Sequence, residues 1–165
     1  MGPRRDTLAA SVMGLSIAMR RREFITLVGS GVAGVLHLRS QALAHAELEQ
    51  FFIAEATRMK NQAVASGDQP FGAVVVKAGV IIGYGPSRVI VDRNPNAHAE
   101  RVALWDAQNR LATADMTGAL IYSTSRPCAA CEHALALANL ERMYFGPDAK
   151  DAGRPKRSLP PSGHG

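Results

Sequence analysis

Cysteine, tryptophan and long apolar runs are scarce in this chain. Its 165 residues include two cysteines, Cys128 and Cys131, and one tryptophan. Without a third cysteine, the chain lacks a ligand that ordinarily closes the fourth position of a structural metal module. The N-terminal stretch from Thr26 to Leu36 is only weakly apolar, is interrupted by glycine and is too short to cross a bilayer. We therefore expect no stable membrane anchor, and no internal repeat is visible.

A surplus of basic residues is also absent from most of the chain. The formal net charge is +5, but residues 1–46 contain six arginines and only two acidic residues. Residues 47–149 contain 9 basic and 11 acidic residues. A protein that binds a long nucleic acid normally presents a basic face. We therefore do not expect a nucleic-acid partner.

The basic N-terminal part has the features of an export signal. Three arginines, Arg20 to Arg22, precede a modest apolar stretch, and small-residue cleavage sites follow at Ala42-Leu43-Ala44 and Ala44-His45-Ala46. This order is typical of a twin-arginine signal. We predict an export segment over residues 1–44 and a periplasmic or secreted mature protein. The alternative is an amphipathic N-terminal helix of the folded domain. Either Met1 or Met19 could be the start of translation.

The rest of the chain alternates between helical and extended patterns. One helix is predicted by apolar residues at spacings of three and four, namely Leu48, Phe52, Ala56, Met59 and Ala63. An antiparallel hairpin is predicted for 71–77 and 80–84, and the elements that follow are a helix over 97–110, a strand over 119–123, a helix over 129–140 and a strand over 143–145. Strands separated by helices imply a three-layer α/β/α sandwich with a mixed central sheet.

The domain boundaries follow from this pattern. We expect the folded domain to span residues 45–148. From Gly146 onward, 10 of 20 residues are glycine, proline or serine, so a flexible tail is predicted for residues 149–165. The domain has room for one modest core, which a homodimer could support.

Two short motifs carry the chemistry. His98-Ala99-Glu100 lies about thirty residues before Pro127-Cys128-Ala129-Ala130-Cys131. A catalytic zinc ion takes three protein ligands and keeps one position for water, and one imidazole with two thiolates is an established set. His98, Cys128 and Cys131 supply that set. Glu100 is not a ligand and is placed to carry protons. The predicted reaction is hydrolytic loss of an amino group from an sp² carbon of a heterocycle.

Both motifs fall where helices are expected to start, in the topology described above. The free N–H groups and the positive end of each helix dipole would favour Cys128 and Cys131 as thiolates. In open α/β sheets, ligand sites lie at the carboxyl ends of the strands. The alternative interpretation is a thiol-disulfide pair, because Cys-x-x-Cys also occurs in redox proteins. Such a pair has no need of His98 and Glu100 upstream.

At these residues the chain resembles the cytidine deaminase-like superfamily, in particular the branch of guanine deaminases and tRNA-specific adenosine deaminases. His-x-Glu followed by Pro-Cys-x-x-Cys is the signature of its zinc deaminases. The resemblance covers about Leu48 to Lys150. Besides the metal motifs, it rests on Pro70-Phe71-Gly72-Ala73-Val74, Pro95-Asn96-Ala97-His98-Ala99-Glu100 and Phe145-Gly146.

The resemblance implies zinc at His98, Cys128 and Cys131 and proton shuttling by Glu100. It also implies that the backbone N–H of Ala99 lies near a substrate carbonyl or amine, and that Phe71 stacks on the base. A core position for Phe71 is the alternative.

The chain departs from the family at three places. Ser87 stands where relatives have an asparagine that binds the substrate. Arg126 stands where relatives commonly have glutamate, and it could lower the thiolate pKa values, bind an anionic substrate group or lie in solvent. The chain also ends soon after its last predicted strand, so we expect the C-terminal helix of relatives to be missing, and the sequence leaves open whether their final strand is present.

These observations lead to one principal hypothesis. We expect a zinc-dependent hydrolytic deaminase that acts on a small nucleobase or nucleoside and releases ammonia. The alternatives are a tRNA adenosine deaminase and a non-catalytic zinc-binding or thiol-disulfide protein.

Overall fold

The structure is a computed structural model that describes the backbone of residues 21–157 and the side chains of residues 38–157. Contacts divide the chain into two units, Met1–Gln41 and Ala42–Gly165. Helix α1, Arg21–Ala65, begins in the first and ends in the second. The predictions about the start of translation and the first arginine of the export motif lie outside the described residues. In the part described, no helix is both long and apolar enough to span a membrane.

The second unit is built on a five-stranded sheet with the order β2-β1-β3-β4-β5. The strands are β1 Gly72–Lys77, β2 Val80–Pro86, β3 Ala119–Ser123, β4 Arg142–Phe145 and β5 Lys150–Gly153. Only β3 and β4 pair in parallel, and the other three pairs are antiparallel. The prediction of a mixed sheet is therefore confirmed.

The β1–β2 hairpin forms where two runs rich in β-branched residues flank Ala78-Gly79. Ala78 has φ of 50° and Gly79 has φ of 77°. A two-residue turn with both central residues at positive φ matches the twist of the strands that it connects. The strands pair from Gly72 opposite Pro86 to Lys77 opposite Val80, with a bulge between Val75 and Val76. The predicted hairpin is confirmed.

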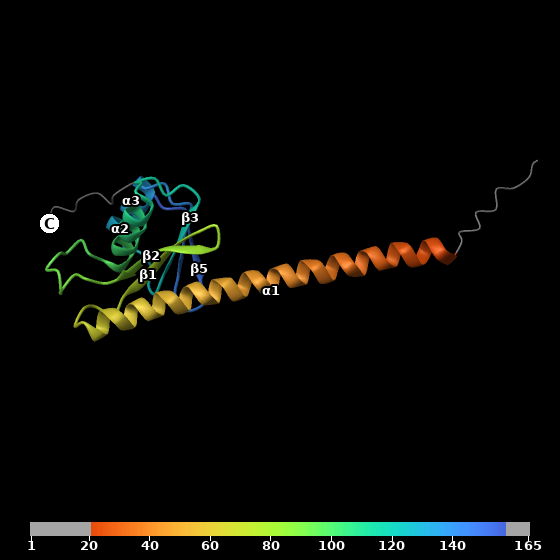
Figure 1. The fold of residues 1–165 in the computed structure, drawn as a ribbon, viewed down its shortest axis with the longest axis horizontal. Helices are drawn as coiled ribbons and strands as arrows, with labels where there is room; N and C mark the ends of the chain where they lie inside the picture. Colours follow the sequence, from red (N-terminus) through yellow and green to blue (C-terminus); the bar gives the residue numbers. More distant parts are fainter. Residues whose placement is uncertain (1–20, 158–165) are drawn as a thin grey trace, which may run out of the picture. The chain divides into compact units, whose positions relative to one another are not determined.

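Helices cover both faces of the sheet (Figure 1). α2, Ala99–Leu111, and α3, Ala129–Leu137, pack on one face, where Val75, Leu104 and Leu135 are buried together. The C-terminal part of α1 packs on the other face, where Phe52, Met59 and Tyr122 share a second core. The α/β/α sandwich predicted from the sequence is confirmed. Its two cores lie on opposite sides of β1 and β3, because successive residues of a strand face opposite ways.

The C-terminal segment corrects the prediction of a flexible tail from residue 149. Lys150–Gly153 forms β5 at the edge of the sheet, and Asp151 pairs with Arg142 at 3.3 Å. Beyond it, the backbone N–H of Lys156 donates to Glu132 of α3 at 3.0 Å. Backbone pairing with β4 creates this strand, although its residues have low β propensity. β5 thus provides a last strand, whose presence the sequence had left open. The described residues contain no helix after α3.

Candidate metal centre and active site

The two motifs meet at one edge of the sheet. β2 ends at Pro86 and β3 at Ser123, and both ends lie beside the start of β1, with Gly72 opposite Pro86 and Ala73 opposite Ser123. The loop after β2 leads to His98, and the loop after β3 leads to Cys128. The site therefore lies at the carboxyl ends of two strands, as ligand sites in α/β sheets commonly do.

Close packing of α2 on β2 positions the first motif. A Cβ atom added to Gly85 would lie 2.0 Å from the carbonyl oxygen of Ala99 and 2.4 Å from the backbone nitrogen of Ala103. Only a residue without a side chain lets the first turn of α2 approach β2 this closely. His98 is the N-cap of α2, and Glu100 lies in its first turn.

His98, Cys128 and Cys131 converge on one point. Their ligand atoms all lie within 4.8 Å of one another. The Nδ1 atom of His98 is 3.6 Å from Sγ of Cys128 and 3.5 Å from Sγ of Cys131. A tetrahedral zinc ion with bonds of about 2.0 Å to nitrogen and about 2.3 Å to sulfur requires a nitrogen–sulfur separation of about 3.5 Å. The donor set and its spacing therefore fit zinc.

The two cysteines differ in their surroundings. Cys128 is exposed and caps α3, where its Sγ accepts a hydrogen bond from the backbone N–H of Cys131 at 3.5 Å. Cys131 is fully buried, and this burial, with the nearby negative charges of Glu100 and Cys128, raises the pKa of its thiol far above the usual range. Both cysteines are free. The start of α3 alone therefore does not make Cys131 a thiolate, and the charge of a bound ion is needed.

Glu100 lies beside the three ligands and is buried, with 5% of its surface exposed. Burial raises the pKa of its carboxyl above the ordinary value, although hydrogen bonds from its own backbone and from Cys131, and the charge of His98, act in the opposite direction. A carboxyl with a raised pKa exchanges protons near neutral pH more readily than an exposed one. This is the property expected of a proton carrier.

A cavity of about 160 Å³ opens beside the metal centre. It is lined by Gln69, Phe71, His98, Ala99, Glu100, Ser125, Arg126 and Cys128. Phe71, which is 40% exposed, and the buried Ala99 thus both line the cavity beside the metal centre. Gln69 and Ser125 were not found by sequence analysis. The sequence feature that could have indicated them is their position, because Gln69 directly precedes Pro70-Phe71 and Ser125 directly precedes Arg126-Pro127.

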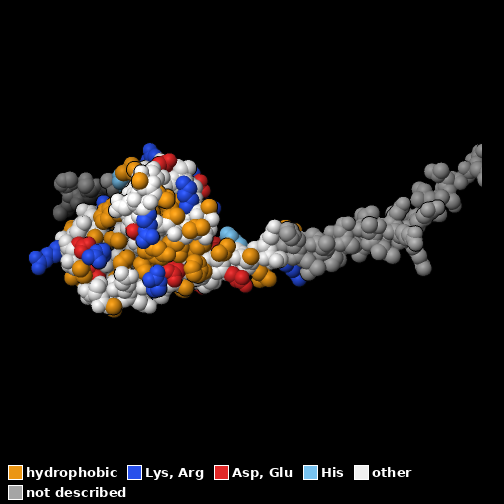
Figure 2. All heavy atoms as spheres, viewed as in Figure 1, with side chains coloured by type: hydrophobic (Ala, Val, Ile, Leu, Met, Phe, Trp, Pro, Cys, Tyr) orange, Lys and Arg blue, Asp and Glu red, His pale blue; other side chains and the backbone are white. Residues whose placement is uncertain are grey.

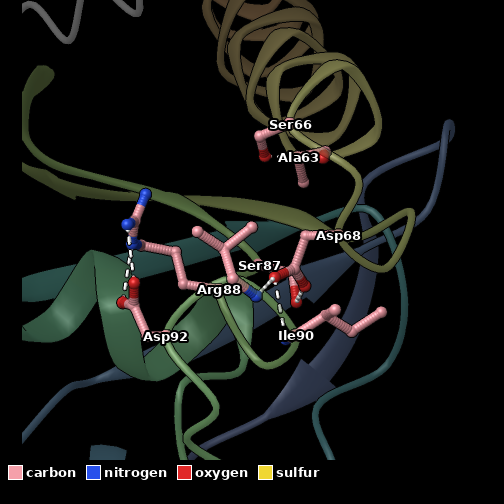
Figure 3. A network of polar contacts seen from close by, with 8 residues as sticks. Ala63, Ser66, Asp68, Ser87, Arg88, Ile90 and Asp92 are labelled. Atoms are coloured by element: carbon pink, nitrogen blue, oxygen red, sulfur yellow. Dashed lines mark hydrogen bonds and ion pairs between the residues drawn. The ribbon is translucent and has the colours of Figure 1, made fainter.

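Ser87 does not line this cavity. Its side chain is 1% exposed, and its hydroxyl donates a hydrogen bond to Oδ1 of Asp68 at 2.8 Å. Asp68 also accepts hydrogen bonds from the backbone N–H groups of Gln69, Ile90 and Val91 at 2.7–2.9 Å. Figure 3 shows how this carboxylate, in the turn after α1, faces the loop after β2. The structure gives Ser87 a part in holding that loop.

This combination of fold and site defines an α/β protein with a His/Cys/Cys metal centre. Residues 40–147 match the family model of the cytidine and deoxycytidylate deaminase zinc-binding region. The chain therefore belongs to the cytidine and deoxycytidylate deaminase family. The zinc ligand set predicted from the sequence lies within the matched region and can form a metal site.

Two curated relatives show where in the family the likeness is strong. The tRNA-specific adenosine deaminase of Aquifex aeolicus (strain VF5) is 36% identical over 97 residues, which are 59% of this chain and 64% of the relative. The guanine deaminase of Bacillus subtilis (strain 168) is 31% identical over 102 residues, which are 61% of this chain and 65% of the relative. The chain thus spans just under two thirds of the length of these relatives.

Solved structures agree on the fold. The X-ray structure of guanine deaminase from Bacillus subtilis superposes with a TM-score of 0.56 at 31% identity, covering 58% of this chain and 62% of the other. A structure from studies of A-to-I editing by tRNA:A34 deaminases gives the same TM-score at 29% identity, covering 58% of this chain and 73% of the other. The cytidine deaminase-like fold is confirmed.

Proposed function

We propose that this protein is a zinc-dependent hydrolytic deaminase that acts on a small nucleobase or nucleoside. One observation supports this above all others. Glu100 lines the same cavity as the ligands His98 and Cys128 while making no contribution to the ligand set. A purely structural zinc site needs no buried carboxyl of this kind beside it.

The residues of the cavity have distinct parts in this reaction. Zinc, when bound, lowers the pKa of a water and so supplies a nucleophile at neutral pH. Glu100 takes the proton from the attacking water and delivers it to a ring nitrogen and then to the departing amine. Phe71 offers an aromatic face on which a heterocycle can stack. The backbone N–H of Ala99 can donate to a carbonyl of the base.

Size and charge support a small substrate. A cavity of about 160 Å³ holds the volume of about five water molecules, which is the scale of a heterocycle. On the face shown in Figure 2, basic and acidic side chains are interspersed and form no continuous basic patch over the described residues. Long nucleic acids are usually bound on such a patch.

Deamination of adenosine in tRNA is the second candidate. It is supported by the 36% identity to the tRNA-specific adenosine deaminase of Aquifex aeolicus. The two candidates differ in their dependence on salt, because binding of a polyanion weakens steeply as salt concentration rises. A screen that includes a tRNA anticodon stem-loop beside free bases and nucleosides, at two salt concentrations, separates them.

The deciding experiment compares the wild type with Glu100→Gln after loading with zinc. The wild type should contain one zinc per chain and release ammonia from at least one base or nucleoside. Glu100→Gln should keep its zinc and lose at least about 100-fold in rate, the usual contribution of a general acid–base. Glu141→Gln, the same substitution at an exposed position, is the control.

Two results would contradict the proposal. A zinc-loaded wild type that releases ammonia from no base, nucleoside, nucleoside monophosphate or tRNA would leave a non-catalytic zinc protein. A metal-free protein in which titration finds no free thiol would instead identify Cys128 and Cys131 as a disulfide pair.

A further inference from the structure

Arg126 is a cation at the mouth of the cavity with nothing to neutralise it. It is exposed, and it lines the cavity together with Ser125 and Cys128. Within the described residues, no hydrogen bond or ion pair is formed by its guanidinium. Four other arginines of the domain are paired with carboxylates, whereas Arg93, like Arg126, has no such partner among the described residues but lies outside the cavity. The pairs are Arg58 with Glu55, Arg88 with Asp92, Arg110 with Asp106 and Arg142 with Asp151.

The backbone around Arg126 is held firmly. The N–H of Thr124 donates to the carbonyl of Gly72 at 2.9 Å, and the N–H of Gly72 donates to Oγ1 of Thr124 at 3.1 Å. The hydroxyl of Ser123 donates to the carbonyl of Ser125 at 2.7 Å. On the other side, Pro127 restricts Arg126 to extended backbone conformations. The backbone that carries the Arg126 side chain is therefore fixed in position. A fixed backbone reduces the entropy that is lost when the side chain binds a ligand.

The size of the cavity determines what Arg126 can meet. The volume beside the metal centre holds one heterocycle. A group attached to that heterocycle must remain at the mouth, where Arg126 is exposed. Among the residues that line the cavity, Glu100 is the only other charged one that is not a ligand, and it is buried. A cationic mouth above a site for a neutral base selects a base that carries an anionic group.

We propose that Arg126 binds the phosphate of the substrate and that the preferred substrate is a nucleoside monophosphate. A guanidinium presents two parallel N–H donors that match phosphate oxygens. A free nucleotide agrees better with the structure than a nucleic-acid strand, because residues 47–149 have more acidic than basic residues. This inference rests on the proposed deaminase activity, and it names the substrate class for the same site.

The kinetic test uses matched pairs of substrates and variants. For each aminated base, kcat/KM is measured for the nucleoside and for its 3′- and 5′-monophosphates. The wild type should prefer one monophosphate over the nucleoside by at least about 10-fold, the effect of one charged hydrogen bond. Arg126→Gln should lose most of this preference, because its kcat/KM should fall much further for the monophosphate than for the nucleoside. Arg126→Lys should lie between them.

A control variant and a folding check make the result specific. Arg93→Gln removes the same charge from an exposed loop position that does not line the cavity, and it should keep the preference of the wild type. Zinc content and thermal unfolding should be the same for all variants, because Arg126 is exposed. A wild type without preference, or an Arg126→Gln variant that keeps it, would overturn the inference.

A binding arm separates this inference from the proposed function. Calorimetry measures the affinity of zinc-loaded wild type and Arg126→Gln for nucleosides and monophosphates, whatever their turnover. Selective binding of monophosphates that Arg126→Gln abolishes, without ammonia release from any substrate, would support Arg126 and contradict the deaminase proposal. Ammonia release, together with equal affinity for nucleosides and monophosphates, would support the deaminase proposal and contradict the role of Arg126. A short single-stranded RNA that competes at lower concentration than the mononucleotide would overturn the assignment to a free nucleotide.

Discussion

Asp68 accepts a hydrogen bond from the hydroxyl of Ser87 at 2.8 Å, across 19 residues of sequence. The same carboxylate accepts the backbone N–H groups of Ile90 and Val91, both at 2.9 Å. It thereby joins the turn that leads to Phe71 with the loop that leads to His98. Two segments that line the cavity are held by one buried side chain, and Figure 3 shows their arrangement.

Asp68→Asn should destabilise the protein. The amide keeps one oxygen, but its NH₂ group faces donors that the carboxylate now satisfies. Leaving buried donors without an acceptor costs about 1–3 kcal/mol in the free energy of unfolding. Urea denaturation of the zinc-loaded protein measures this. Asp92→Asn, which removes an exposed carboxylate paired with Arg88, should have little effect, and equal losses in the two variants would refute this role of Asp68.

The contribution of Asp68 should depend on pH in a defined direction. Burial raises the pKa of its carboxyl, but the hydrogen bonds from Val91, Gln69, Ser87 and Ile90 outweigh this, so the pKa is lowered in the folded protein. A lowered pKa gives stability that is present above the unfolded value of about 3.9 and is lost as the pH falls through the folded value. The difference in unfolding free energy between wild type and Asp68→Asn should be constant near pH 6–7 and should shrink below about pH 4. A difference that grows on acidification would contradict this.

Gly85→Ala should disturb both the fold and the metal centre. The new methyl group would lie 2.0 Å from the carbonyl oxygen of Ala99, and backbone atoms of α2 cannot move aside as a flexible side chain can. Overpacking of this kind costs about 1–3 kcal/mol or more. Because Ala99 lies between His98 and Glu100, zinc affinity should fall as well. Gly67→Asn is the control, because the space around Gly67 is open and asparagine tolerates its positive φ of 82° better than most residues. Unchanged zinc affinity in Gly85→Ala would contradict the expectation.

Sequence patterns predicted the elements whose residues are locally consistent. The hairpin over 72–86 has two runs rich in β-branched residues and a turn glycine that accepts positive φ, and strand 119–123 is found with the predicted bounds. β5 was missed because Lys150-Asp151-Ala152-Gly153 has no β-branched residue, and only its neighbour β4 makes it a strand. Such tertiary effects override local propensity.

Some residues of the candidate site could be predicted from the sequence, and others depend on contacts that only the fold creates. His98, Cys128 and Cys131 could be predicted, because zinc ligands need particular residue types and occur at characteristic spacings. Whether Ser87 reached the cavity could not be predicted, since this depends on Asp68, which lies in a different loop. The polar residues Gln69 and Ser125 were missed because no required residue type marks them.

Zinc binding should release protons, because burial raises the pKa of the Cys131 thiol in the metal-free protein. At pH 7 this thiol carries its proton, and a zinc ligand must be deprotonated. Affinity for zinc should therefore rise with pH between 6 and 8. Calorimetric titrations in buffers with different ionisation enthalpies measure the number of protons released. No release would contradict the protonated state of Cys131, and Cys131→Ser, which removes the buried thiol, should release fewer protons than the wild type.

Removal of the proposed export segment should leave the domain intact. Side chains from Leu38 to Leu48 are exposed, and the first buried one among the described side chains of α1 is Phe52. A chain that starts at Glu47 should therefore melt within about 3 °C of the full chain, because changes at exposed sites cost little. A chain that starts at Lys60 loses Phe52, Ile53, Ala56 and Met59 from the core and should unfold at a much lower temperature.

N-terminal sequencing of secreted protein should find His45 or Glu47 as the first residue, because the predicted cleavage sites end at Ala44 and Ala46. A first residue upstream of Leu43 would contradict the predicted cleavage.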